Sequence, residues 1–449
     1  MISLNDFLEK AGKVVPSARQ LERLRETQFY AFIHFSPNTY TGLEWGTGKE
    51  DPAIFNPTEL DCDSWVEAIK AAGMKGAVIT AKHHDGFCLW QTETTEHSIK
   101  NSPYKNGKGD IVRELAEACK RGGIKFGFYL SPWDRNASCY GTDEYNDFYR
   151  AQLTELLTNY GEVFHVWLDG ACGEGPSGKK QVYDFESYFE LVRKYQPNAT
   201  IFKDDGPDLR WCGNESGSAR ASEWAVVPYE LCCYCEKQTE GKLMEGSLEG
   251  MCNCNCDIGT LENIIYSEGL VFAPSEIDMS IRPGWFYHPE EEPHSLERLF
   301  NTYLKSVGAN TTFNLNIPPM PNGLFDPRDV QRLKELGEKI RSTFAVNLCE
   351  NAKITCTHTS PTQSEYLVEL DGEKEIKYVE LMENIAEGQR VASFRIAFRV
   401  DGLWAKDYEN YTTIGNRKIC PQDPVTCDAF KVIIMSSRGR ADIEKIAAY

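Results

Sequence analysis

The chain has 449 residues, of which 41% are hydrophobic and 12% aromatic. Because single hydrophobic cores stop growing at about 250–300 residues, we expect one large domain with a smaller one, or two to three comparable domains. The formal net charge of −19, from 48 Lys and Arg against 67 Asp and Glu, argues against nucleic acid or an anionic membrane as the main partner.

Short apolar segments alternate with helix-like segments between about residues 29 and 320. The expected strands cover residues 29–35, 77–81, 124–130, 163–168 and 199–203, and the expected helices cover 65–72, 111–120, 144–159 and 188–194. Glycines at 73 and 122–123 end two of these helices. Strands that are apolar on both faces indicate a parallel sheet covered by helices, either doubly wound or closed into a (β/α)8 barrel.

The barrel is favoured because polar and aromatic residues follow the strand ends, which is where a barrel builds its active site. These residues are His34, His83, His84, Asp85, Tyr129, Trp133 and Asp169. The first strand is not followed by a Gly-x-Gly-x-x-Gly motif, which weakens the doubly wound, nucleotide-binding alternative.

The pattern changes after a helix expected over residues 328–343. Segments 353–357, 366–370, 391–400 and 430–435 alternate apolar and polar residues between turn residues, which indicates antiparallel strands. We therefore predict a (β/α)8-like barrel over residues 1–345, followed by a small β-sandwich over residues 346–449.

Asp169 is the most informative candidate, because it ends the apolar segment 163–168. A carboxylate at the mouth of a buried strand either caps the next helix or turn, or does chemistry. The polar residues at the other strand ends favour chemistry.

Two further motifs suit a carbohydrate. The adjacent His83 and His84 can hydrogen-bond sugar hydroxyls; a metal site is the rival interpretation, although His-x-His and His-Glu-x-x-His patterns are absent from the sequence. Glu44 and Trp45 place a carboxylate beside an aromatic face, which suits a pyranose ring but also fits a surface loop with a packed Trp.

The partner of Asp169 is open at this point. Glu215 lies in a loop between Gly213 and Gly217, where the backbone can approach a ligand, and Glu223 and Glu276 compete for the same role. The cysteine-rich segment 232–256 holds one Cys-x-x-Cys pair without a second of the same form, which leaves zinc, a disulfide and free thiols as alternatives.

Taken together, the motifs resemble the α-L-fucosidases of glycoside hydrolase family 29. Five motifs occur in that family's order between roughly residues 25 and 345: His34-Phe35-Ser36, Glu44-Trp45-Gly46, Lys82-His83-His84-Asp85-Gly86-Phe87, Trp167-Leu168-Asp169-Gly170 and the segment from Ser280 to Tyr287. Residues 308–318 are similar to the family's last barrel strand. The resemblance implies an irregular barrel with a C-terminal β-sandwich, and a reaction without a cofactor or metal.

The resemblance also implies the roles of the residues. It makes Asp169 the nucleophile of a retaining, exo-acting hydrolysis through a covalent fucosyl-Asp, with Glu215 as the acid/base about 5–5.5 Å away. The loop around Glu215 is similar to the branch that cleaves α-1,3/1,4 linkages on branched glycans, so the expected partner is a fucosylated oligosaccharide or glycoconjugate. The fucose contacts carried over are His34, Glu44, Trp45, His83, His84, Tyr129 and Trp285.

One departure concerns Phe35-Ser36, where many family members have Trp-Gly, which leaves the packing under His34 open. Two other functions also stay open from the residues alone. One is a metal-dependent hydrolase built on the His pair and the cysteine cluster, and the other is a non-catalytic carbohydrate-binding protein.

The sequence also bears on location. The N-terminus lacks a basic segment before an apolar run, and the sequence has no stretch near the roughly 18 apolar residues of a membrane span. Its 16 scattered cysteines fit reduced thiols better than a disulfide framework. We expect a cytoplasmic protein without a membrane partner, and a processed secreted form stays an alternative.

Overall fold

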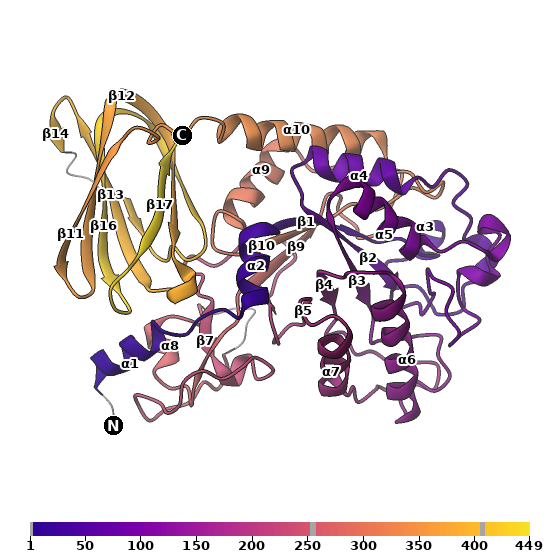
Figure 1. Cartoon of the computed structure of the whole chain (residues 1–449). Coiled ribbons are helices and arrows are strands. Elements are labelled where there is room, and N and C mark those ends of the chain that lie inside the picture. The colour runs from indigo at the N-terminus through magenta and orange to yellow at the C-terminus, as the bar shows by residue number, and fades with distance from the viewer. Residues whose placement is uncertain (1–2, 252–256, 405–408) are drawn as a thin grey trace.

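Two β-sheet domains lie side by side in the computed structural model, which describes residues 3–251, 257–404 and 409–449 (Figure 1). The predicted fold class, a (β/α)8-like barrel followed by a C-terminal β-sandwich, is confirmed. Helix α10 (Pro327–Thr343) runs along one edge of the barrel toward the sandwich, whose first strand begins at Lys353. The predicted boundary at residue 345 lies in this connection.

The barrel sheet contains parallel strands in the order β5-β4-β3-β2-β1-β10-β9-β6. Its strands are β1 (Phe29–Ile33), β2 (Gly76–Lys82), β3 (Lys125–Leu130), β4 (His165–Trp167), β5 (Thr200–Phe202), β6 (Arg210–Trp211), β9 (Ser275–Ser280) and β10 (Thr312–Asn316). Between the two ends of this order, a single parallel bridge joins Phe202 of β5 to Leu209. The barrel is therefore nearly closed, with an irregular seam between β5 and β6.

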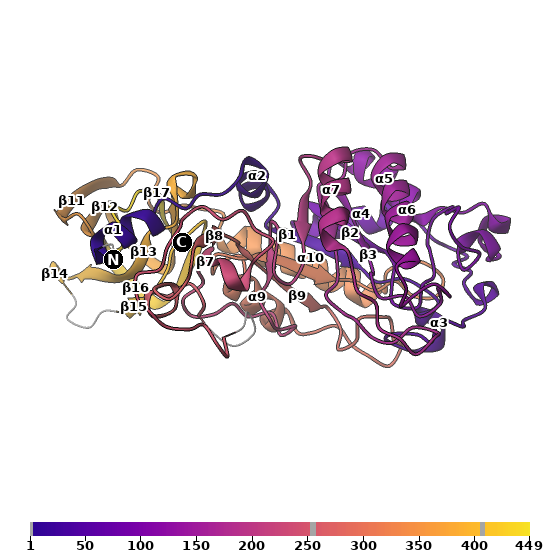
Figure 2. The ribbon, with the colours of Figure 1, turned by 90° about the horizontal axis from the view of Figure 1, so that it is seen from below.

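Helices cover the outside of most of the barrel (Figures 1 and 2). They are α4 (Cys62–Ala71), α5 (Ile111–Gly122), α6 (Glu144–Asn159), α7 (Phe185–Tyr195), α9 (Leu296–Lys305) and α10. Aspartates at 61, 110, 184 and 326 cap the N-termini of α4, α5, α7 and α10 by accepting backbone N–H groups. Gly123 ends α5 in the left-handed conformation at φ 70°, as its sequence position predicts.

The seam departs from the regular repeat of strand and helix. The described connection 203–209 between β5 and β6 contains no helix. Between β6 and β9 lies a long connection that contains the antiparallel strand pair β7 (Val226–Pro228) and β8 (Leu270–Phe272) and, between them, the short helix α8 (Leu261–Ile264). These elements are too short to be predicted from hydrophobic periodicity, because each is only three or four residues long.

The N-terminal helices tie the two domains together. They are α1 (Leu4–Ala11) and α2 (Ala18–Glu26), whereas the short α3 (Asn38–Thr41) lies in the loop after β1. Phe7 and Ala11 of α1 join a buried cluster with Val226 of β7, Leu270 of β8 and Ile385 of the sandwich. In Figure 2, α1 accordingly lies next to the sandwich although it opens the sequence.

The sandwich is built from antiparallel strands in the order β11-β12-β16-β13-β14, with β15 on β13 and β17 on β12. Their bounds are β11 (Lys353–Ser360), β12 (Gln363–Glu383), β13 (Val391–Val400), β14 (Leu403–Trp404), β15 (Glu409–Tyr411), β16 (Lys418–Ser437) and β17 (Ile443–Ala448). The predicted segments 366–370 and 430–435 lie near the start of β12 and near the end of β16, where the two strands pair with each other. Register shifts interrupt the pairing of these two long strands.

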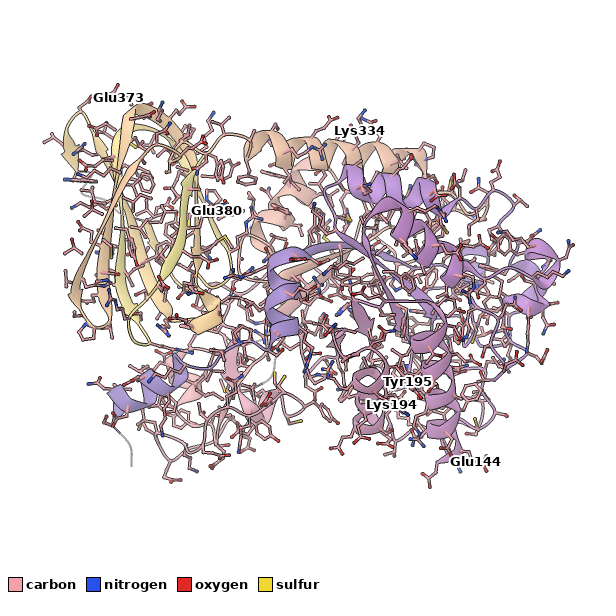
Figure 3. All side chains as sticks on the ribbon, in the orientation of Figure 1. Glu144, Lys194, Tyr195, Lys334, Glu373 and Glu380 are labelled. Atoms are coloured by element: carbon pink, nitrogen blue, oxygen red, sulfur yellow. The ribbon has the colours of Figure 1, made fainter. Side chains whose placement is uncertain are left out.

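A buried charge cluster joins the sandwich to the barrel. Glu380 of β12 lies on the side of the sandwich that faces the barrel (Figure 3) and accepts hydrogen bonds from Arg417 at 2.7 Å and from Lys445 and Tyr449 at 2.8 Å. Arg417 also donates to the hydroxyl of Tyr303 in α9 at 3.0 Å. Among the described helices, none is long and apolar enough to cross a membrane.

Candidate active site

A cavity of about 400 Å³ opens at the C-terminal ends of the barrel strands. All of the predicted site residues line it: Asp169, Glu215, His34, Glu44, Trp45, His83, His84, Tyr129 and Trp285. They come from strand β3 and from the connections after β1, β2, β4, β6 and β9, which the parallel barrel brings to one end. Trp45 is 60% exposed and stands at the rim, 5.9 Å edge-to-face from Trp133.

Asp169 is held at two points in this cavity. Its Oδ2 accepts a hydrogen bond from the hydroxyl of Tyr129 at 2.9 Å, and its Oδ1 accepts the backbone N–H of Ala171 at 2.7 Å. Burial and the neighbouring Asp169 raise the pKa of Tyr129 well above its usual range, so Tyr129 stays a donor. The side chain of Asp169 keeps 25% of its surface exposed, which leaves the carboxylate open to a ligand.

The tautomer of His84 follows from its neighbours. The hydroxyl of Ser131 donates to the carbonyl of Trp133 at 2.7 Å, so the 2.7 Å contact with His84 makes Nδ1 of the imidazole the donor. Burial lowers the pKa of His84, although the charge of Asp169 opposes this effect. The ring is therefore neutral, and its Nε2, 3.9 Å from Asp169 Oδ2, is an acceptor facing the cavity.

His34 is held in the same way by Asn316. The amide nitrogen of Asn316 donates to Ser280 at 2.9 Å and to the carbonyl of Trp285 at 2.8 Å, so its oxygen accepts from Nδ1 of His34 at 2.8 Å. Burial lowers the pKa of His34 to about 3. His34 and His84 thus both present unprotonated Nε2 atoms, which suit the hydrogens of hydroxyl groups.

Glu44 joins the first loop to the loop that carries Trp285. Its carboxylate accepts the backbone N–H of Trp285 at 2.9 Å and contacts Nε2 of His288 at 3.0 Å. Trp285 in turn lies 5.0 Å from the ring of His34. Glu44 and Trp285 therefore form one wall of the cavity, in which a carboxylate lies next to an aromatic face.

Glu215 lines the cavity from the loop after β6. The residue is exposed at the open rim, yet its carboxyl group is partly desolvated there. This desolvation raises the pKa of Glu215, and the negative charges of Asp169 and Glu44 raise it further, while a hydrogen bond from Trp285 acts in the opposite direction. The two carboxyl groups thus interact electrostatically across one cavity.

The two competing glutamates lie elsewhere. Glu223 is buried in an ion pair with Arg210 and does not line the cavity. Glu276 is buried inside the barrel, where it accepts from Tyr30 at 2.6 Å and pairs with Arg23 at 3.0 Å. Burial alone would raise the pKa of Glu276, but His165, Arg23 and Tyr30 lower it to about 2. Both carboxylates are therefore used structurally.

The cavity also contains residues that the sequence analysis did not single out as site residues. Asp278 of β9 accepts the indole N–H of Trp211 at 2.8 Å, and burial raises its pKa well above the usual range. Trp167 and Phe202 stack at 4.1 Å in the same wall. The available signal was the period-2 alternation in Ser275–Ser280, which puts Glu276 and Asp278 on the same, inward face.

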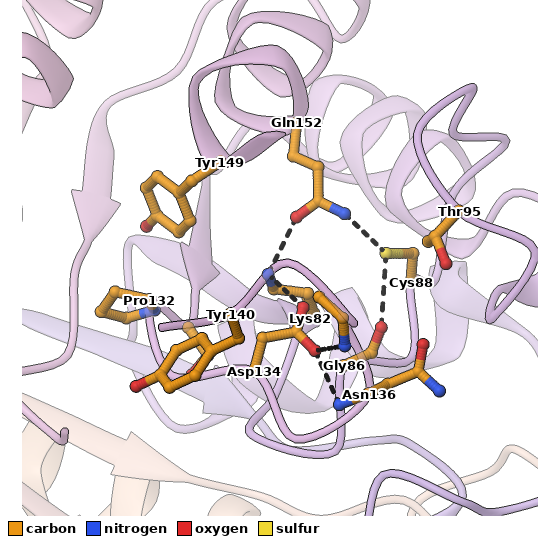
Figure 4. Close-up of polar contacts among 12 residues, drawn as sticks. Lys82, Gly86, Cys88, Thr95, Pro132, Asp134, Asn136, Tyr140, Tyr149 and Gln152 are labelled. Carbon is orange, nitrogen blue, oxygen red and sulfur yellow. Dashed lines mark hydrogen bonds and ion pairs between the residues drawn. The ribbon is translucent and has the colours of Figure 1, made fainter. Parts of the chain in front are cut away.

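A buried lysine supports the loops beneath the site (Figure 4). Lys82, the last residue of β2, pairs with Asp134 at 3.0 Å and donates to Gln152 of α6 at 2.8 Å. Asp134 also accepts the backbone N–H groups of Asn136 and Ala137. The cluster thus connects the strand end that precedes His83 with the loop after β3 and with helix α6.

The Phe35-Ser36 departure has a defined packing. Phe35 is fully buried against Phe55 and Trp65, at ring distances of 5.0 and 6.2 Å. The hydroxyl of Ser36 donates to buried Asp85 at 2.7 Å. Ser36 therefore links the first loop to the loop that carries the His pair.

The metal interpretation is not favoured. Among the described residues, no group of three or more His, Cys, Asp or Glu side chains is arranged to hold a metal ion. The described cysteines are free, and Cys233 and Cys235 line a different cavity from the one that holds His83 and His84. Cys252, Cys254 and Cys256 lie outside the described residues.

Comparison with known proteins is consistent with this site. A family model described as Alpha-L-fucosidase matches residues 17–342. The chain is 40% identical over 438 residues to Alpha-L-fucosidase 1 of Arabidopsis thaliana, covering 90% of this chain and 81% of the plant protein.

Two solved structures extend the comparison. A glycoside hydrolase 29 family member from an unknown rumen bacterium is 38% identical with a TM-score of 0.85, over 97% of this chain and 77% of that one. A Ruminococcus gnavus GH29 fucosidase in complex with fucose is 28% identical with a TM-score of 0.83, over 97% of this chain and 95% of that one.

Proposed function

This chain belongs to the alpha-L-fucosidase family, glycoside hydrolase family 29, and is an alpha-L-fucosidase; on that premise we propose that it is an exo-acting, retaining enzyme with Asp169 as nucleophile and Glu215 as acid/base. One observation carries the proposal. Asp169, oriented by Tyr129 and a backbone N–H, shares a cavity with a second carboxyl group whose pKa its charge helps to raise. Retaining glycosidases require two carboxyl groups in one site, one as the nucleophile and one with a raised pKa as the acid/base.

The first step uses both groups. Asp169 Oδ attacks the anomeric carbon of fucose, the glycosidic C–O bond breaks, and Glu215 transfers its proton to the leaving oxygen. The products are a fucosyl ester of Asp169 and the free acceptor sugar. In the second step Glu215 takes a proton from water, whose oxygen attacks the anomeric carbon and releases Asp169, so the anomeric configuration is retained.

The remaining residues bind the sugar. The unprotonated Nε2 atoms of His34 and His84 accept hydrogens from fucose hydroxyls, and the faces of Trp285 and Trp167 suit its C–H groups and methyl. At about 400 Å³ the cavity suits one monosaccharide, which supports exo action on a terminal fucose.

We assign the substrate to α-1,3/1,4-linked fucose on branched glycans. The support is the Gly213-Asn214-Glu215 loop and the open rim at which Glu215 stands. A second cavity adjoins Glu215 and Trp285 on the other side, so a branched leaving group has room beside the acid/base.

Fucose release from a Lewis-type trisaccharide, compared with an aryl fucoside, tests the proposal. Asp169→Ala should lose at least about a thousandfold in kcat but still bind the trisaccharide, because the nucleophile acts only in the chemical step. Glu215→Ala should lose far more activity on the trisaccharide than on an aryl fucoside with a good leaving group, which needs little acid assistance.

The matched control is Asp143→Ala, which removes an exposed aspartate whose side chain makes no capping hydrogen bond. Azide should restore turnover of the aryl fucoside by Glu215→Ala, and NMR of the first product of the unaltered enzyme should show retained anomeric configuration. Full activity of Asp169→Ala, or inversion in the first product, would refute the assigned mechanism.

A further inference from the structure

A second, smaller cavity of about 290 Å³ shares two wall residues with the active site, Glu215 and Trp285. Its other lining includes Ser280, Arg282, His294 and Arg298, and we call it the basic pocket. Because the acid/base residue flanks the glycosidic bond, a second space that the same residue lines is open to the leaving group. The basic pocket therefore lies where the acceptor part of the glycan would extend.

The charge in this pocket comes from Arg298. Arg282 is neutralised by buried ion pairs with Asp329 at 2.8 Å and Asp326 at 3.0 Å. Arg298, in the first turn of α9, has no ion pair within the part of the chain that the structure describes; its Nη1 lies 3.3 Å from Nδ1 of His294. Burial and the charge of Arg298 lower the pKa of His294 to about 4, so this partner is neutral.

Two acidic side chains of the preceding loop already have partners. Glu291 accepts the backbone N–H of Gly284 at 3.1 Å, and Glu292 pairs with Arg328. The N-terminus of the ten-residue helix α9 adds a partial positive charge at the same place. An uncompensated guanidinium in a pocket that Glu215 also lines is thus poised to bind an anion, although the chain as a whole has a net charge of −19.

We propose that the basic pocket is a leaving-group subsite that binds an anionic substituent of the glycan, with Arg298 as the specificity-determining residue. Sulfate esters and the carboxylate of a sialic acid share the required chemistry, a planar or tripodal set of oxygens that a guanidinium binds through two N–H groups. The substituent is held and not transformed. This inference rests on the proposed function, because it places the leaving group relative to Glu215.

Three matched glycans test the inference: a neutral Lewis-type trisaccharide, its sulfated form and its sialylated form. We expect kcat/KM for at least one anionic form to exceed that of the neutral glycan by about tenfold, with the ratio falling as salt rises. Arg298→Met should bring the ratio to about one, and Arg298→Lys should keep part of it, because charge remains while the bidentate geometry is lost. The sulfated and sialylated arms show which anion is preferred.

Arg440→Met is the matched control, since Arg440 is also exposed and contacts one histidine, His358, at 2.9 Å, but lies in the sandwich. In Arg440→Met, the ratio of kcat/KM for the anionic glycan to kcat/KM for the neutral glycan should equal that of the unaltered enzyme. Calorimetric binding of the same glycans to Asp169→Ala decides the inference independently of turnover. Failure to hydrolyse any of the glycans would refute the proposed function, whereas equal binding and equal kcat/KM for neutral and anionic forms would refute the subsite.

Discussion

Replacing Lys82 by Met would test how the buried cluster under the His pair supports the fold. Lys82 is fully buried, and its ammonium contacts Asp134 at 3.0 Å, Gln152 at 2.8 Å and Tyr145 at 3.3 Å. Met has a similar length and no charge, so the substitution removes the interactions and leaves little cavity. Asp134 then becomes a buried carboxylate without its cation.

Removing one partner of a buried ion pair typically costs about 3–5 kcal/mol. We expect the lower half of that range, about 3–4 kcal/mol, because Asp134 Oδ1 keeps the backbone N–H groups of Asn136 at 2.9 Å and Ala137 at 2.8 Å. Lys13→Met is the matched control: its pair with Glu9 is exposed, so its removal should cost less than about 0.5 kcal/mol.

Urea unfolding, followed by near-ultraviolet circular dichroism for the whole chain and by activity for the barrel, measures the effect. The double variant Lys82→Met/Asp134→Asn removes the stranded charge while keeping an oxygen for the two backbone donors, so it should recover at least about 1 kcal/mol. We also expect kcat/KM to fall about tenfold in Lys82→Met, since Lys82 directly precedes His83. If the single and double variants were equally stable, the unpaired carboxylate would not be the cause.

Two pH predictions follow from the neutral and protonated groups of the site. Glu44→Gln removes a negative charge that helps to raise the pKa of Glu215, so the basic limb of kcat/KM should shift to lower pH; an unchanged limb would contradict the coupling. Burial lowers the pKa of His34 to about 3, below its value of about 6.5 in an unfolded chain. Below about pH 6.5 the unfolded state therefore binds more protons than the folded state, so the free energy of unfolding decreases as the pH is lowered. When the pH is lowered from 7 to 5, the free energy of unfolding measured by urea titration should therefore fall by about 2 kcal/mol less in His34→Gln than in the unaltered protein. His358→Gln, at an exposed position, is the control and should lose as much unfolding free energy over this pH range as the unaltered protein.

The sequence predicted best where local patterns and packing agree. Helix α6 has the predicted bounds, Glu144–Asn159, and β13 those of the predicted segment 391–400. The carboxyl ends of parallel barrel strands all lie at one end of the barrel. The shared location of Asp169, His84 and Tyr129 could therefore be predicted without knowing how the intervening helices pack.

Glu276 marks where that reasoning stops. Its partners Arg23, Tyr30 and Thr312 are distant in sequence, and only the closed barrel shows that the carboxylate is already satisfied. From local sequence Glu276 is therefore a candidate acid/base, although it lies in a fully buried strand, Ser275–Ser280, where its carboxylate is already paired. Non-local contacts of this kind decide which carboxylates are available for chemistry, and local sequence does not contain them.

The irregular seam explains why the residue pattern alone does not distinguish Glu215 from Glu223 and Glu276. In a regular βα unit, a helix would begin soon after β6 and its N-terminus would face the cavity. Here the chain continues as a loop that Trp211 fixes to Asp278 at 2.8 Å and that Asn214 closes by donating to Ser218 at 3.0 Å. Gly217, at φ 81°, fits against Thr302 only without a side chain. Loss of the helix thus places a carboxyl group at the rim, between the cavity proposed for fucose and the pocket proposed for its leaving group.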